Sequence, residues 1–215
     1  MASEKNIATV SYIEQDFDIN ALDDPAWSKA QAVLIDRYWS GEFAPPSRQF
    51  KARILWSDTS VYVRFDARLD EPLVVSDVPN LTKKSIGLWD RDVCEIFIAS
   101  DSSIPSKYYE FEVAPTGEWL DVAVEVQTDR RISDWEYRSN MSTAARIDKG
   151  LVILAMRIEW EAFGRKPKLG DIWLGNLFRC VGKDPDRGYL AWRPTYTSVP
   201  SFHVPECFGQ FRFMG

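Results

Sequence analysis

Histidine and cysteine are scarce in this sequence, which has one histidine and three cysteines among 215 residues. His203 stands alone, so a Ser/His/Asp triad or a two-histidine metal site lacks the partners that it needs. Cys94, Cys180 and Cys207 show no CxxC spacing and are odd in number, so we interpret them as small apolar fillers. P-loop and GxGxxG spacings are also missing, which removes the common nucleotide-binding motifs.

Long apolar runs and clusters of basic residues are missing as well. No stretch approaches the roughly 18 consecutive apolar residues of a membrane span, and residues 1–10 do not resemble a signal peptide. The formal net charge is −6, and basic residues come in pairs such as Lys83-Lys84 and Arg130-Arg131. We therefore expect neither nucleic acid nor a membrane as partner. We expect a cytoplasmic protein unless a leader segment was removed, so the localisation stays open.

Aromatic residues are abundant, at 13% of the chain with nine tryptophans. Large aromatic side chains suit both β-strands and stacking platforms for ligands. Hydrophobic residues make up 45% and charged residues 27%, which is an ordinary composition for a soluble globular protein. No internal repeat, low-complexity tract or linker divides the chain, so residues 1–215 are expected to form a single domain.

Alternation of apolar and polar residues with a period of two dominates the chain. Val61, Val63, Phe65 and Ala67 share one face of a predicted strand, which is typical of a half-buried antiparallel strand. Turn residues between β-rich runs predict hairpins at 57–59, 116–117 and 149–150. Roughly eleven strands and no long amphipathic helix predict an all-β fold, namely a two-sheet antiparallel β-sandwich of jelly-roll-like type.

Three segments carry more specific expectations. Residues 160–164, WEAFG, are predicted to form one helical turn that ends at Gly164. Residues 129–140 are polar and are predicted to form a loop, and residues 209–215 are predicted to form a closing edge strand.

The segment LWDRDVCEIFI, residues 88–98, places charged residues inside an apparent buried strand. Alternation puts Cys94, Ile96 and Ile98 on one face and Glu95 with Phe97 on the other. Glu110 and Glu112 share one face of the run YYEFEVAP. If the two strands pair, three carboxylates crowd one face of the sheet. A solvated strand face, an internal ion pair between Glu95 and Arg179, and a catalytic carboxylate pair are the alternatives.

Four segments together resemble the family 9 carbohydrate-binding modules and their relatives. These are LWDRDVCEIFI, YYEFEVAPTGEWLD, RIEWEAFGRKPKLGDIWLGNLFR and WRPTYTSVPSFHVPECFG, which occur in this order. The resemblance as a whole extends from about Asp23 to Phe213. The resemblance implies a β-sandwich of about eleven strands and a role in sugar binding.

The resemblance also implies a site in which two aromatic rings enclose a sugar and polar side chains bind its hydroxyl groups. The motif W-x-x-D-x-x-E places the first ring at Trp89 and a hydroxyl-binding carboxylate at Glu95. The second ring is Phe202, just before the P-x-x-F-G ending, and the basic contact of the family falls on the acidic Glu112. Arg179 and Trp192, with Asn176 and Arg193, are further candidates on the same expected surface.

The predicted function is therefore non-catalytic carbohydrate recognition, with a mono- or oligosaccharide as the partner. Two alternatives are a glycoside-active enzyme that uses the carboxylates and a structural or partner-binding sandwich whose sugar site has decayed. No cofactor is certain. A structural calcium ion is an alternative in the loops at 101–103 and 183–188, and a haem with His203 as axial ligand is another.

Overall fold

The computed structural model describes residues 6–215, and in this range the strands hydrogen-bond into one mixed sheet of 13 strands. The prediction that residues 1–10 are not a signal peptide falls partly on residues 1–5, which lie outside the described range. The order along the sheet is β8-β7-β6-β5-β11-β13-β1-β3-β4-β10-β9, with β12 paired to β11 and β2 paired to β3. The all-β prediction is confirmed, but the strand count and the purely antiparallel pairing are not.

The strands are short to medium in length. The first seven are β1 (Ile7–Tyr12), β2 (Val33–Ile35), β3 (Phe50–Trp56), β4 (Ser60–Arg68), β5 (Val93–Ala99), β6 (Lys107–Val113) and β7 (Trp119–Val126). The others are β8 (Arg131–Asp134), β9 (Ser142–Asp148), β10 (Leu151–Glu159), β11 (Ile172–Val181), β12 (Gly188–Ala191) and β13 (Gly209–Met214).

Four short 3-10 helices lie between the strands of residues 6–215. They are η2 (Pro25–Lys29), η3 (Leu88–Asp90), η4 (Trp160–Phe163) and η5 (Pro205–Cys207). The predicted turn at WEAFG is η4, and Gly164 ends it with a positive φ of 64°. None of these helices has the length and the hydropathy that crossing a membrane requires.

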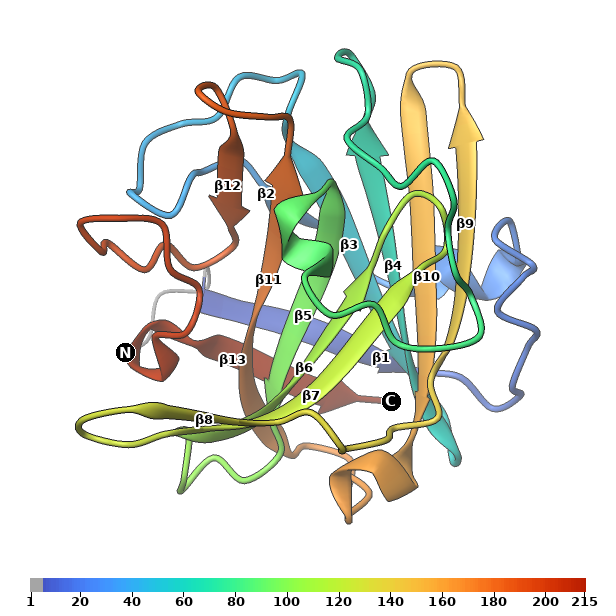
Figure 1. Cartoon of the computed structure of the whole chain (residues 1–215). Helices are drawn as coiled ribbons and strands as arrows, with labels where there is room; N and C mark the ends of the chain where they lie inside the picture. Colours follow the sequence, from blue (N-terminus) through green and yellow to red (C-terminus); the bar gives the residue numbers. More distant parts are fainter. Residues whose placement is uncertain (1–5) are drawn as a thin grey trace.

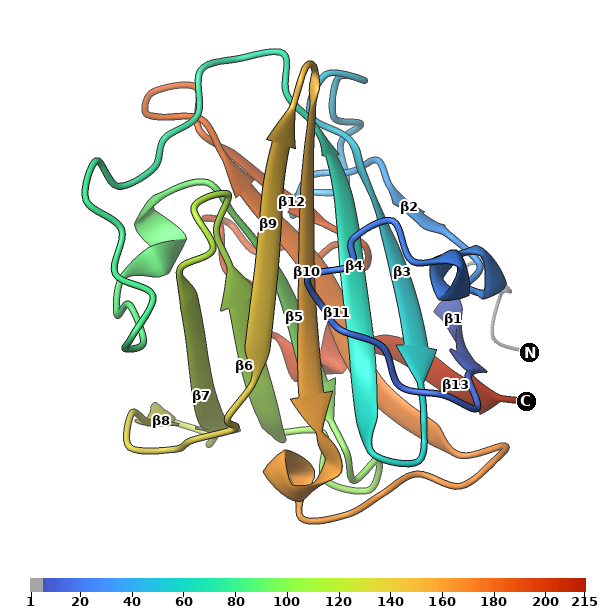
Figure 2. The same cartoon turned by 90° about the vertical axis from the view of Figure 1, so that its right-hand side faces the viewer.

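The sheet curls so that two layers face each other, with β5, β6, β7 and β11 opposite β3, β4, β9 and β10 (Figures 1 and 2). The main core lies between these layers, because the inward members of each alternating strand point there. Val63 and Phe65 of β4 belong to this core together with Ile96 of β5 and Leu154 of β10. The alternation predicted for residues 61–67 is therefore confirmed.

Two of the segment predictions need correction. Residues 209–215 do not form an edge strand, because β13 lies between β11 and β1 and pairs in parallel with β1. Residues 129–140 are not wholly a loop, because β8 pairs antiparallel with β7 from Arg131 to Asp134. Polar residues can form such a strand at the end of a sheet, where neither face has to be buried.

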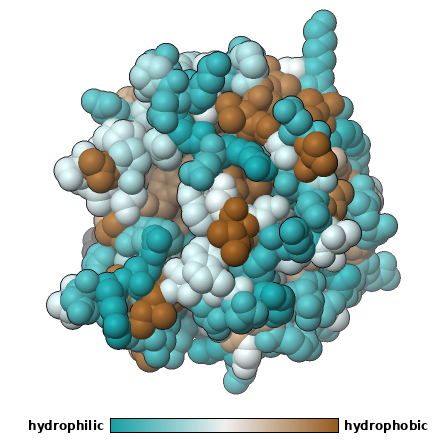
Figure 3. Space-filling model, viewed as in Figure 1, coloured by the Kyte–Doolittle hydropathy of each residue, from teal (hydrophilic) through white to brown (hydrophobic). Residues whose placement is uncertain are grey.

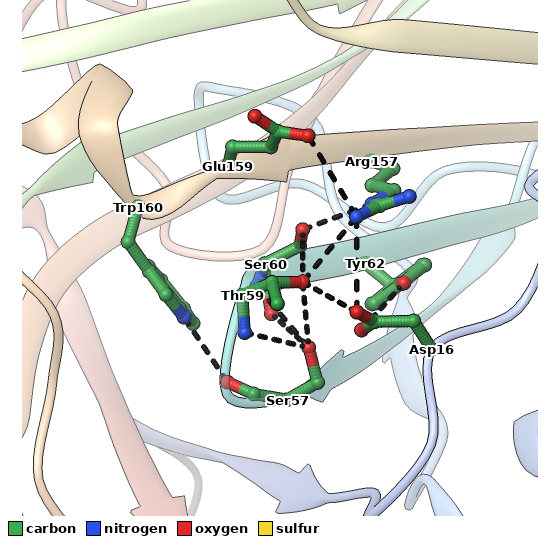
Figure 4. A network of polar contacts seen from close by, with 8 residues as sticks. All are labelled: Asp16, Ser57, Thr59, Ser60, Tyr62, Arg157, Glu159 and Trp160. Atoms are coloured by element: carbon green, nitrogen blue, oxygen red, sulfur yellow. Dashed lines mark hydrogen bonds and ion pairs between the residues drawn. The ribbon is translucent and has the colours of Figure 1, made fainter.

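The outer face of β4 and β10 is covered by the segment that follows β1. Phe17 stacks on Tyr62 with ring centroids 4.6 Å apart, and Ile19 and Trp27 complete an apolar cluster with Ile153. A polar network fixes this cover to the β3–β4 turn (Figure 4).

Asp16 is the acceptor that joins the network to the covering segment. It accepts hydrogen bonds from Thr59 Oγ1 at 2.6 Å and from the hydroxyl of Tyr62 at 2.9 Å. The Arg157 guanidinium donates to Ser60 Oγ at 2.9 Å from the neighbouring strand, as Figure 4 shows. Burial raises the pKa of Asp16, but the hydrogen bonds outweigh it, so the pKa is lowered below its ordinary value.

We expect Asp16→Asn to lower the free energy of unfolding by about 1 kcal/mol at pH 7, because the amide cannot accept both hydrogen bonds as a carboxylate does. A lowered pKa stabilises the fold above the unfolded-state pKa, near 3.9, and this contribution is lost as the pH falls through the folded-state value. The difference between wild type and variant should therefore shrink below about pH 4. Urea unfolding at pH 7 and pH 3 measures it, with the exposed Glu14→Gln as control. An equal loss at both pH values would contradict the role given to the ionised carboxylate.

Candidate functional site

A cavity of about 280 Å³ lies on the outer face of β5, β6 and β11. Its lining comes from four parts of the chain, namely η3, the strands of the floor, the β8 segment and the loop that follows β12. Figure 1 shows β8 at the lower left and the loop after β12 at the left. The surface on this side is mostly hydrophilic with separate apolar patches (Figure 3).

Sheet register places two glutamates side by side, of which Glu95 lines the cavity and Glu112, a predicted ligand contact, does not. Glu95 of β5 lies directly opposite Glu112 of β6, and its other cross-strand neighbour is Phe178 of β11. Glu110 lies opposite Phe97, one step further along the same face. The prediction that pairing of these strands would crowd three carboxylates onto one face is confirmed.

The three carboxylates are buried and close together. Glu95 is 2% exposed, Glu110 4% and Glu112 0%, and each contributes an oxygen that lies within 4.8 Å of the others. Neither oxygen of Glu112 accepts a hydrogen bond from an N–H or hydroxyl group of the described residues. The solvated strand face is therefore wrong. All three side chains are buried, and Leu120 and Val122 of β7 pack beside them.

Burial raises the pKa of all three carboxyl groups. For Glu95 and Glu112 the pKa rises well above the ordinary value, and the neighbouring carboxylates add to the effect of burial. Burial raises the pKa of Glu110, and a hydrogen bond with the carboxyl group of Glu112 and the positive charge of Arg131 offset part of this rise. Like charges this close share protons, so the three groups titrate together.

Cys180 of β11 donates a hydrogen bond to Oε1 of Glu95 at 3.5 Å. Burial raises the pKa of this thiol well above its ordinary value, so the thiol keeps its proton and acts as the donor. The sequence-based view of Cys180 as an apolar filler misses this contact, because only the register of β11 against β5 brings the two side chains together.

Trp89 stands at the rim of the cavity and is 37% exposed. Gly87, with a φ of 83°, starts the η3 turn that carries it. The Arg187 guanidinium, which comes from the loop between β11 and β12, holds this turn because it donates to the carbonyl oxygens of Trp89 and Arg91, each at 2.7 Å. The indole is thus presented to solvent on a fixed backbone.

Trp135 is the aromatic neighbour of Trp89, with ring centroids 6.0 Å apart and planes inclined by 37°. It follows β8, whose Arg131 and Ser133 also line the cavity. None of these three residues was among the sequence-based candidates. The only signal for them was a tryptophan within a polar segment, and the loop prediction for residues 129–140 hid it.

Phe202 forms part of the cavity wall and is 9% exposed. Its ring lies flat on Phe178, with centroids 4.1 Å apart and an interplanar angle of 11°. One face of Phe202 is therefore used by the fold, and the other is the face that a ligand can contact.

His203 follows Phe202 and also lines the cavity. Its Nδ1 shares a hydrogen bond of 2.7 Å with the hydroxyl of Tyr108, and its Nε2 lies 3.9 Å from a carboxylate oxygen of Glu110. Burial, with the positive charge of Arg131, lowers the pKa of His203 to about 3. The imidazole is therefore neutral at pH 7 and does not balance the charge of Glu110.

Arg179 does not line this cavity, although the sequence suggested it as a sugar contact. It alternates with Phe178 and Cys180 and so points to the opposite face of β11, where it donates to the carbonyl oxygens of Arg48 at 2.7 Å and Arg68 at 2.9 Å. The alternative of an ion pair between Glu95 and Arg179 is wrong for the same reason.

Trp192 and Asn176 also lie away from the cavity. The Trp192 ring stacks on Phe211 with centroids 5.7 Å apart, over Gly209, where any side chain would collide with it. Asn176 is fully buried, donates to the carbonyl oxygen of Arg193 at 2.8 Å and accepts from the Arg193 backbone N–H at 2.9 Å. These residues tie β11 to the chain that follows β12.

The positions of the three carboxyl groups can be compared with those of the catalytic pair in glycosidases. Retaining and inverting glycosidases hold two carboxyl groups about 5–5.5 Å or 6.5–9.5 Å apart on either side of a sugar. Here each carboxyl group has an oxygen within 4.8 Å of the others, and all three rise from one sheet face. Three carboxylates at this spacing instead suit a single cation between them.

The two loops considered for calcium use their aspartates in other ways. Asp101 Oδ1 accepts hydrogen bonds from the backbone N–H and the hydroxyl of Ser103 at 2.9 and 2.6 Å, which is an ordinary turn arrangement. In the loop at 183–188, Arg187 donates to the carbonyl of Gly182 at 2.7 Å. The structural calcium ion stays a prediction.

The fold and the cavity together define an all-β protein with aromatic rings at the rim of a cavity and buried carboxyl groups at its floor. The sequence model of the carbohydrate family 9 binding domain-like family matches residues 19–214, and the chain belongs to this family. A curated relative, described as an extracellular protein of Arthroderma benhamiae, is 26% identical over 183 residues, which cover 79% of this chain and 80% of the relative.

Solved structures share the fold. A crystal structure of a Bacteroides uniformis protein has a TM-score of 0.75 at 17% identity, covering 97% of this chain and 99% of that chain. A family 9 carbohydrate-binding module from Caldicellulosiruptor kristjanssonii in complex with cellotriose has a TM-score of 0.69 at 15% identity, covering 97% and 94%. The module from the same organism in complex with glucose has a TM-score of 0.68 at 16% identity, covering 97% and 96%. At these identities the likeness concerns the fold.

We expect Glu112→Gln to stabilise the protein at alkaline pH. A carboxyl group whose pKa is raised by folding costs no stability below its unfolded-state pKa, and stability is lost as the pH rises through the folded-state value. The glutamine does not ionise, so the variant should be more stable than wild type by about 1–3 kcal/mol at pH 8 and closer to it at pH 4. Urea unfolding from pH 4 to 8 measures this, with the exposed Glu159→Gln on β10 as control. Parallel curves of stability against pH for wild type and Glu112→Gln would contradict the raised pKa of the buried Glu112 carboxyl group.

Proposed function

We propose that this protein is a non-catalytic carbohydrate-binding protein and that the cavity at Trp89 and Glu95 is its sugar site. The observation that carries the proposal is the combination of exposed and half-exposed aromatic rings at the rim with carboxylates at the floor of one cavity. This combination matches the two kinds of surface that a sugar ring presents, which are apolar C–H faces and hydroxyl groups.

The aromatic rings supply the stacking surface. Trp89 and Trp135 stand together at the rim, and Phe202 with Tyr189 forms the wall beside them. A pyranose ring laid against an indole buries its C–H face and gains dispersion and electrostatic attraction from the π-system. In this role Trp135 complements Trp89 more closely than Phe202 does, because Phe202 is nearly covered by Phe178.

The carboxylates supply directional contacts. Glu95 and Glu110 line the cavity, so their oxygens can accept hydrogen bonds from sugar hydroxyl groups in a site with little competing water. Glu112 lies beneath them, outside the cavity lining, and interacts with both of their carboxyl groups. Arg131 and Ser133 on β8 add donors at the other side of the cavity.

The size of the cavity favours one sugar ring. Small-molecule sites have volumes of about 300–1,000 Å³, and the 280 Å³ here lies just below that range. The related modules from Caldicellulosiruptor kristjanssonii were solved with glucose and with cellotriose, which supports a monosaccharide or a chain end as ligand. The position of all three carboxyl groups on one sheet face, and not on two sides of a bound sugar, supports binding without hydrolysis.

We expect Trp89→Ala and Trp135→Ala each to weaken sugar binding about tenfold or more, which corresponds to roughly 1.4 kcal/mol per ring. Titration calorimetry with a panel of monosaccharides and disaccharides measures the affinity, and reducing-sugar release from glycans tests for turnover. Phe43→Ala is the matched control, because Phe43 is a solvent-exposed aromatic that stacks on Arg37 outside the cavity. Unchanged affinity in both tryptophan variants, or turnover that Glu95→Gln abolishes, would reject the proposal.

A further inference from the structure

Acidic groups outnumber basic groups at the floor of the cavity. Glu95, Glu110 and Glu112 form the cluster, and within residues 6–215 no lysine or arginine lies within ion-pair distance of any of them. Arg131 lines the cavity from the exposed strand β8, and its charge acts on Glu110 from a distance. His203 is neutral at pH 7 and so does not offset the three carboxylates.

Glu112 gives an independent sign that the cluster is incomplete. Its side chain is 0% exposed, neither of its oxygens accepts a hydrogen bond from an N–H or hydroxyl group of the described residues, and the polar groups beside it are the carboxyl groups of Glu95 and Glu110. A buried carboxylate without a partner is strongly unfavourable, and natural folds pair such groups with a cation or a donor. A neutral sugar supplies no cation, so the carboxyl groups would have to keep their protons when it binds.

The surroundings of the cluster favour an organic ammonium group over a metal ion. Calcium needs six to eight oxygen ligands. Asp90 is one further carboxylate in the cavity lining, but the groups packed directly against the cluster are the rings of Phe97 and Phe178, the side chains of Leu120 and Val122, and the thiol of Cys180. An ammonium group needs only two or three acceptors for its N–H donors, and aromatic faces attract its charge.

We propose that the cavity is selective for a sugar that carries a free protonated amine, such as a 2-amino-2-deoxyhexose, with the ammonium group held between Glu95 and Glu110 and the ring against Trp89. This inference rests on the proposed function, since it takes the aromatic rim as the surface that binds the ring. Glu95 and Glu110 line the cavity and contact the ligand, and Glu112 completes the negative field from beneath. In the free protein, protons that the cluster shares stand where the ammonium group binds.

The geometry predicts a simple order of affinities. The amine of an aminohexose is cationic at about pH 6, because its pKa is similar to that of an α-amino group, near 7.7–8.0. Glucose keeps the ring but lacks the charge, and N-acetylglucosamine keeps the nitrogen but neutralises it. Ethanolamine keeps the charge but lacks the ring. Glucosamine alone satisfies both the carboxylates and the aromatic rim.

Titration calorimetry at pH 6 with these four compounds tests the inference. We expect glucosamine to bind at least tenfold more tightly than glucose, N-acetylglucosamine and ethanolamine. Glu95→Gln and Glu110→Gln should each bring glucosamine down toward the affinity of glucose, whereas Glu159→Gln, which removes an exposed carboxylate on the far layer, should change nothing. Thermal unfolding of each variant confirms that it is folded, and either of the two cavity variants suffices for the comparison.

The outcomes separate this inference from the proposed function. Glucose binding as tightly as glucosamine overturns the amine selectivity and leaves carbohydrate binding intact. Binding of none of the sugars overturns both. Equal binding of ethanolamine overturns the role of the ring. If EDTA abolishes sugar binding and Ca²⁺ restores it, the cluster binds a metal ion and the ammonium inference is overturned.

Discussion

The burial of three carboxylates on one face of a β-sheet is the constraint on which the rest of the site depends. Glu95 and Glu112 are held opposite each other by the register of β5 and β6, and Glu110 is brought beside them by the pleat of the same strand. Water cannot solvate them fully, because rings and aliphatic side chains of neighbouring strands surround them. A protein keeps such an unfavourable arrangement where a ligand or a proton relieves it.

The rigid sheet makes this arrangement precise, and the loops turn it into a cavity. The floor belongs to strands whose opposite faces pack into the main core, so a shift of one residue in β5 would exchange Glu95 with the buried Ile96. The rim comes from a 3-10 turn clamped by Arg187, from the chain around β8 and from the loop after β12. Binding residues on loops over a fixed scaffold are a common solution in β-proteins.

Local patterns in the sequence predicted the strands and the carboxylate cluster, because alternation and turn residues act over a few residues. The resemblance to the family 9 modules, and not these patterns, placed Trp89 and Phe202 near the cluster, and both line the cavity. The place of β13 between β11 and β1 depends on pairing between the ends of the chain, which no local pattern encodes. Trp135 was missed because β8 is polar, and Arg179 was misplaced because its neighbours in sequence, not the alternation of β11, guided its choice.

A crystal structure of the protein soaked with glucosamine tests the account most directly. The account predicts the sugar ring against Trp89, with its amine nitrogen about 2.7–3.2 Å from carboxylate oxygens of Glu95 and Glu110. A sugar bound elsewhere on the protein, or a ring in the cavity with its amine turned to solvent and a hydroxyl on the carboxylates, would contradict it.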